Sequence, residues 1–210
     1  PGLIKKISEP FRKTLLDKSL DKAFISHALT LPSESELGIL ISETTPIDPE
    51  SIHQVRDFVT CLIAKELKKD FQQIYDENQE KGTYNIDAKS IARRSLKNLA
   101  LSYLGRLKSP EIINLAWNQF KAAENMTDEI SALSVLSHIQ CEEREKAIDD
   151  FYGICLNDFH EDFPKINLEN ACKFVLDEFL LGRHFDRKDD SKISSYQYIP
   201  LIGKSGEAFA

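Results

Sequence analysis

The sequence has little of several residue types, and each scarcity argues against a class of protein. Only 8 glycines and 8 prolines occur among 210 residues, too few for a collagen-like or low-complexity chain. No apolar run approaches the roughly 18 residues that a helix needs to span a bilayer. The formal net charge of -7 argues against a surface for nucleic acid or anionic lipid. We therefore expect a folded domain that binds neither nucleic acid nor membrane.

Cysteine is scarce and unpaired. The four cysteines (Cys61, Cys141, Cys155 and Cys172) are dispersed, and no C-x-x-C spacing occurs among them. Disulfide frameworks and zinc fingers both need clustered cysteines. The spacing instead predicts buried free thiols in the reducing cytoplasm.

Motifs for metal or phosphate binding are also missing. A zinc peptidase places two histidines at i and i+4 of one helix with a glutamate between them. The nearest candidate begins at His160, but Pro164 stands where the second histidine is needed and would break the helix. Gly203-Lys204-Ser205-Gly206 is similar to the end of a phosphate-binding loop but lacks the earlier glycine and the preceding strand. We expect no catalytic residue, metal or cofactor in this chain.

Helical signals are abundant. Leu, Ile, Ala, Lys and Glu are frequent, and apolar residues recur every three or four positions. Residues that cap helices stand before most of these patterns. Helix starts are expected at Ser33 with Glu36 as a capping box, Asp48-Pro49, Asp87, Ser109-Pro110, and Asn125 or Thr127.

Several helices can be described further. Glu9-Pro10 is expected to break or start a helix, because proline lacks an N–H group. The pattern after Asp48 predicts one helix of some 30 residues that ends near Asn78. The predicted inward faces are Leu20, Ala23, Phe24, His27 and Ala28; Leu37, Leu40 and Ile41; and Ile91, Leu96, Leu99, Ala100 and Leu104.

The order of the patterns predicts an all-α fold. A helix, a short polar turn and another helix follow one another without a fixed sequence period. This organisation is typical of a superhelical array of antiparallel helix pairs, a HEAT/ARM-like α-solenoid. We assign residues 1–186 to this helical-repeat domain, with a last helix at 167–181. Residues 187–210 would form a charged loop and a tail without a clear period.

Two polar clusters stand out. Arg93, Arg94 and Lys97 form a small basic patch on one predicted helix. The patch is either a solvated or salt-bridging face or a cavity wall that attracts carboxylates. The residues Asn125-Met126-Thr127-Asp128 suit the start of a helix, because Asn, Thr and Asp all accept hydrogen bonds from backbone N–H groups.

An ordered set of segments resembles one protein family. The densest similarity runs from Tyr84 through Asp128, and the whole set covers about Phe11 to Phe151. The segments are Phe11-Arg12-x-x-Leu15-Leu16-Asp17, Leu29-Thr30-Leu31-Pro32-Ser33-Glu34, Pro46-Ile47-Asp48-Pro49, Ile91-Ala92-Arg93-Arg94-Ser95-Leu96-Lys97-Asn98, Asn118-Gln119-Phe120 and Asn125-Met126-Thr127-Asp128. In this order they resemble the C-terminal helical domain of bacterial aminopeptidase N, a family of zinc-dependent gluzincin exopeptidases.

The resemblance implies a function for the fold. In that family the domain is an α-superhelix that closes over the zinc site and restricts access to peptide substrates. Zinc and the catalytic groups would then lie in a catalytic domain of the same polypeptide, which this sequence lacks. The candidate cavity-lining or interdomain residues are Arg93, Arg94, Asn118, Asn125 and Asp128. Near the C-terminus, only Leu201-Ile202-Gly203 is similar to the family's pattern.

Three functional hypotheses follow. The chain opens with Pro1-Gly2 and its only methionine is Met126, so we expect a piece of a longer product. As part of a cytoplasmic aminopeptidase, it would cap the active site and be inactive alone. One alternative is a stand-alone α-solenoid that binds a protein or peptide, and another is a helical enzyme of unrecognised kind.

Overall fold

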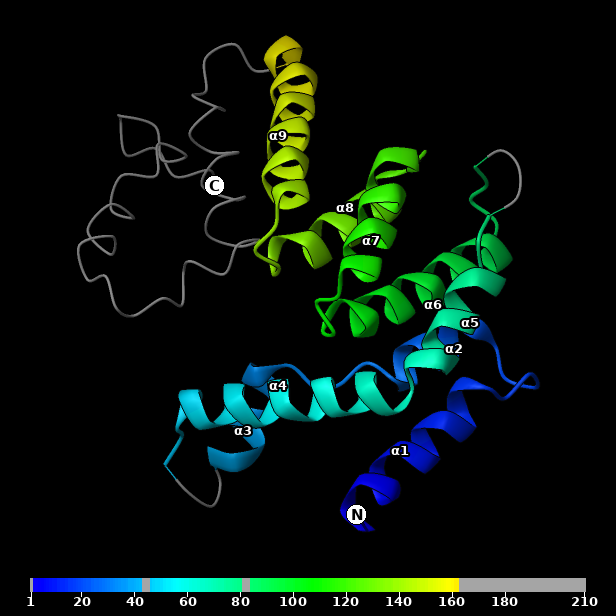
Figure 1. Cartoon of the computed structure of the whole chain (residues 1–210), viewed down its shortest axis with the longest axis vertical. Coiled ribbons are helices and arrows are strands. Elements are labelled where there is room, and N and C mark those ends of the chain that lie inside the picture. Colours follow the sequence, from blue (N-terminus) through cyan, green and yellow to red (C-terminus); the bar gives the residue numbers. More distant parts are fainter. Residues whose placement is uncertain (1, 43–45, 81–83, 163–210) are drawn as a thin grey trace. The chain divides into compact units, whose positions relative to one another are not determined.

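The computed structural model describes residues 2–42, 46–80 and 84–162, with side chains for residues 4–42, 46–80 and 84–153. Every regular element in this part of the chain is an α-helix, which confirms the all-α prediction (Figure 1). The helices are α1 (Gly2–Leu15), α2 (Lys22–Ala28), α3 (Glu34–Ser42), α4 (Pro49–Glu66), α5 (Lys68–Glu77), α6 (Ala88–Gly105), α7 (Pro110–Ala122), α8 (Met126–Ser137) and α9 (Glu142–Asp162).

The chain forms two compact units. The first comprises Pro1–Ala132 and the second begins at Leu133. The expected boundary between residues 186 and 187 lies outside the described residues, as do the helix expected at 167–181 and the predicted tail.

Helix α6 is the centre of the first unit. It packs against α2, α4, α5 and α7, and Figure 1 shows these helices around it. Its buried apolar side chains include the predicted Leu96, Ala100 and Leu104. Buried apolar area is the main stabilising contribution to such a core. The segment that resembles the aminopeptidase family most densely therefore also organises the packing.

Most of the predicted capping residues make cap hydrogen bonds at the helix starts, whereas Ser109 precedes α7 without a side-chain cap hydrogen bond. The Asp48 carboxylate accepts from the N–H groups of Glu50 and Ser51, and the Asp87 carboxylate accepts from Ser90. At α3 the capping box is complete. The Ser33 N–H donates to Glu36 Oε2 at 2.7 Å, and the Glu36 N–H donates to Ser33 Oγ at 3.2 Å. These bonds satisfy backbone groups that lack partners within a helix.

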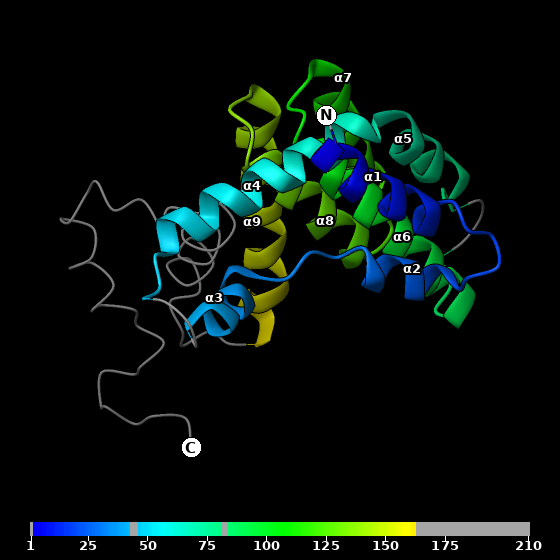
Figure 2. The same ribbon diagram turned by 90° about the horizontal axis from the view of Figure 1, so that it is seen from below.

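Two helix boundaries differ from the predictions. Pro10 lies inside α1, which runs without a break from Gly2 to Leu15. The single long helix predicted after Asp48 is two helices, α4 and α5, that meet at Leu67. No glycine or proline marks this joint. Arg12 of α1 lies at it, where its guanidinium donates to the Glu66 carbonyl at 3.3 Å and to Asp70 Oδ2 at 2.9 Å. Figure 2 shows α1 beside α4.

Some predicted inward faces are wrong. In α2, Ile25 is buried, as is Leu29 just after the helix, whereas Phe24 is 56% exposed. Ser26 lies between the two buried residues, and its hydroxyl donates to the Ser95 carbonyl of α6 at 3.1 Å. A two-turn helix has apolar residues on more than one side, and here the contact with α6 decides which side is buried. Leu40 and Ile91 are also exposed.

An aromatic cluster fills the core beside α6. The Phe71 and Tyr103 rings stack at 4.7 Å with an interplanar angle of 7°, and Phe11 meets both rings edge-on. Such ring pairs stabilise a core beyond their buried area. The Tyr103 hydroxyl donates to the Leu29 carbonyl at 2.8 Å. Burial raises the pKa of Tyr103 above its ordinary value, so this phenol stays neutral in the folded state.

The second unit has its own apolar core and contains α9. The buried apolar side chains described there are Leu133, Val135, Leu136, Ile139, Ala147 and Phe151.

Cys141 lies just before α9 and is half-buried, as is Cys61 in the first unit, so these thiols are less buried than predicted. Partial burial raises the pKa of the Cys141 thiol. Among the helices that the structure describes, none combines the length and the apolar character of a membrane span.

Candidate functional site

Lys97 of α6 and Asp128 of α8 form a buried ion pair. The Lys97 ammonium donates to Asp128 Oδ2 at 2.7 Å, and the two side chains are only 5% and 7% exposed. Charges that leave water are stable only when they are paired and hydrogen-bonded. The pair joins residues that lie 31 positions apart in the sequence.

Amide side chains extend this pair into a larger network. Asn98 Nδ2 donates to Asp128 Oδ1 at 2.8 Å. Gln119 Nε2 donates to Asn98 Oδ1 at 2.9 Å and to the Asp128 carbonyl at 3.0 Å. The Tyr75 hydroxyl in turn donates to Gln119 Oε1 at 2.9 Å. The bonded side chains come from α5, α6, α7 and the start of α8. We call this set the four-helix network: Tyr75, Lys97, Asn98, Gln119, Asn125 and Asp128.

Asn125 caps α8, in agreement with one of the two predicted alternatives. Its Oδ1 accepts from the Asp128 N–H at 2.9 Å, and its Nδ2 donates to Asp128 Oδ2 at 3.1 Å. Thr127, the other candidate, is exposed. Asp128 also places a negative charge in the first turn of the helix, where the helix dipole favours it.

The four-helix network is suited to structure rather than to chemistry. The Asp128 carboxylate accepts from one ammonium and two side-chain amides, so both of its oxygens are occupied. A general base must instead reach the proton of a substrate. Satisfied polar groups in a core fix the helices in one arrangement, because any displacement leaves a buried group unpaired.

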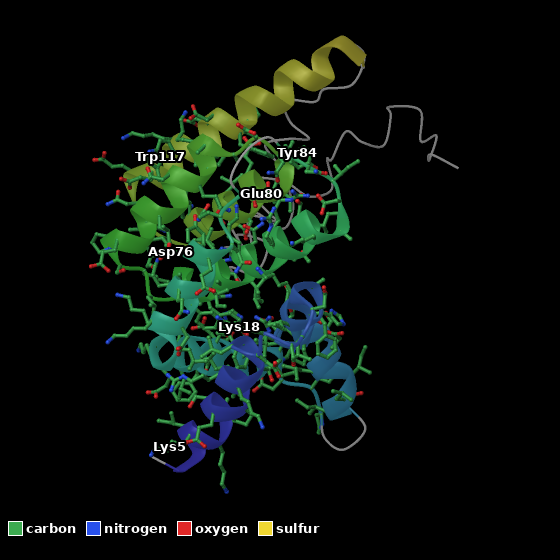
Figure 3. All side chains as sticks on the ribbon, turned by 90° about the vertical axis from the view of Figure 1, so that its right-hand side faces the viewer. Lys5, Lys18, Asp76, Glu80, Tyr84 and Trp117 are labelled. Carbon is green, nitrogen blue, oxygen red and sulfur yellow. The ribbon has the colours of Figure 1, made fainter. Side chains whose placement is uncertain are left out.

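Arg94 of α6 forms a second buried cluster with residues of the segment between α5 and α6. Its Nη1 donates to Glu80 Oε1 at 2.7 Å and to the Asn85 carbonyl at 2.8 Å. Its guanidinium lies 4.8 Å from the centre of the Tyr84 ring. Figure 3 shows Glu80 and Tyr84 close to one another. The Arg94 side chain is 4% exposed. Its carboxylate partner is Glu80 of the same chain.

The predicted basic patch is therefore not solvated at Arg94 and Lys97. Each of these cations is buried against a carboxylate, in agreement with the salt-bridging alternative. Arg93 is half-buried and donates to Ser90 Oγ at 3.3 Å, while its Nε is buried and has no hydrogen-bond partner among the described residues. Asn118 is exposed on α7. For all five candidates (Arg93, Arg94, Asn118, Asn125 and Asp128) the assignment to a cavity or interdomain surface stays a prediction.

Sequence reasoning missed several members of these clusters. The sequence does not identify Tyr75 or Glu80 as members of these clusters, because an aromatic and an acidic residue near a helix end have many ordinary roles. The network could have been detected from polar residues that stand at positions where the helical period predicts buried apolar ones. Lys97 is adjacent to Leu96, and Gln119 to Phe120, and all four side chains are buried.

The described part of the chain contains no group of three or more His, Cys, Asp or Glu residues that could hold a metal ion. A catalytic zinc needs three protein ligands and an open position. The described residues therefore offer no ligand trio for zinc, and the aminopeptidase resemblance implies that ion only for a separate catalytic domain.

The family comparison covers most of this chain. Residues 2–159 match the family described as "Domain of unknown function (DUF3458_C) ARM repeats". Aminopeptidase N of Escherichia coli K12 is 33% identical over 145 residues, which are 69% of this chain and 16% of that protein. Aminopeptidase N of Caulobacter vibrioides is 29% identical over 148 residues, or 70% of this chain and 17% of that protein.

A solved structure agrees with these relatives. Legionella pneumophila aminopeptidase A, crystallised in complex with aspartic acid, superimposes with a TM-score of 0.61 and 30% identity. The match covers 73% of this chain and 19% of that one. The chain thus spans less than a fifth of the length of the relatives it matches. It belongs to the DUF3458_C ARM-repeat family, and its fold is that of a C-terminal domain of aminopeptidase N.

Proposed function

We propose that this chain is most of the C-terminal helical domain of a zinc aminopeptidase that removes N-terminal residues from peptides. The domain covers the active site and limits which substrates reach it, and it performs no chemistry of its own. The observation that carries this proposal is the match to aminopeptidase N over 145 residues, which are only 16% of that enzyme. The remaining part of such a polypeptide is long enough to hold a complete catalytic domain.

The packing of the first unit suits a covering role. Its conspicuous polar groups, in the four-helix network and around Arg94, are paired within the unit. A cover must keep its shape while a substrate enters, and satisfied buried polar groups favour one arrangement of helices. Excluding water and bulky substrates is a recognised way to assist a catalytic site that other residues form.

Metal analysis and an activity assay test this proposal together. We expect residues 1–210 alone to bind no stoichiometric zinc and to leave aminoacyl-anilide substrates intact. The longer polypeptide that contains them should hold about one zinc ion per chain, because a catalytic site needs a ligand trio, and should hydrolyse the same substrates.

Both negative outcomes are informative. Zinc-dependent turnover by residues 1–210 alone would refute a covering domain without chemistry. If the longer polypeptide lacked zinc and turnover, the stand-alone α-solenoid that binds a protein or peptide would become the better hypothesis.

A further inference from the structure

No further inference is drawn: the strongest candidate, the buried Arg144 guanidinium in the first turn of α9, is already paired with Gln140 and Glu145, and nothing in the described part of the chain points to a ligand for its buried Nε.

Discussion

Asp128→Ala is expected to destabilise the chain by about 3–5 kcal/mol, because removing one partner leaves the buried Lys97 ammonium without a counter-charge. The Asn98 and Asn125 amides would lose an acceptor in the same step. Urea denaturation followed by circular dichroism at 222 nm measures the loss as a lower midpoint.

An exposed ion pair supplies the control for this prediction. Lys68 and Glu111 lie 3.2 Å apart, with side chains that are 46% and 78% exposed. Glu111→Ala should cost no more than about 1 kcal/mol, because water screens such a pair. If Asp128→Ala cost as little as Glu111→Ala, the four-helix network would not hold the helices together.

Phe71→Ala is the second substitution with a large expected effect. The Phe71 side chain is 0% exposed and contacts both Phe11 and Tyr103. We expect a loss of about 3–5 kcal/mol from the lost burial and the cavity left between the helices. The same urea titration measures it.

Phe24→Ala is the comparison for Phe71→Ala. Phe24 is 56% exposed, so its truncation should stay within about 0.5 kcal/mol. A similar midpoint for the two variants would show that the aromatic cluster contributes little to stability.

Helix starts were the part of the fold that the sequence predicted best. Asp48, Asp87, the Ser33 and Glu36 pair, and Asn125 all make the expected cap contacts. Capping depends on groups within three residues of one another, so a local pattern contains the information.

Properties that depend on distant residues could not be predicted in this way. The joint at Leu67 has no glycine or proline, and the Arg12 side chain that binds there comes from 54 residues earlier. In α2, the burial of Ile25 in place of Phe24 follows from the packing on α6. Pro10 continues a helix that its missing N–H group would normally interrupt.

The candidate site residues show the same difference between local contacts, which the sequence predicts, and distant contacts, which it does not. The sequence placed Asn125 and Asp128 together, because both belong to one cap. It marked Arg94 and Lys97 as cations on one helix but gave no means to find their partners. Glu80 lies 14 positions before Arg94, and Asp128 lies 31 positions after Lys97. Only the packing of α6 against neighbouring segments turns a basic patch into two separate buried ion pairs.

Substrate size selectivity of the longer polypeptide tests the central claim most directly. The measurement is kcat/KM for a short free peptide and for a folded protein with the same N-terminal residues, in the wild-type enzyme and in Asp128→Ala. We predict that the wild type cleaves the peptide and not the folded protein, and that the variant, with a loosened cover, discriminates less. Equal cleavage of both substrates by the wild type would contradict the account.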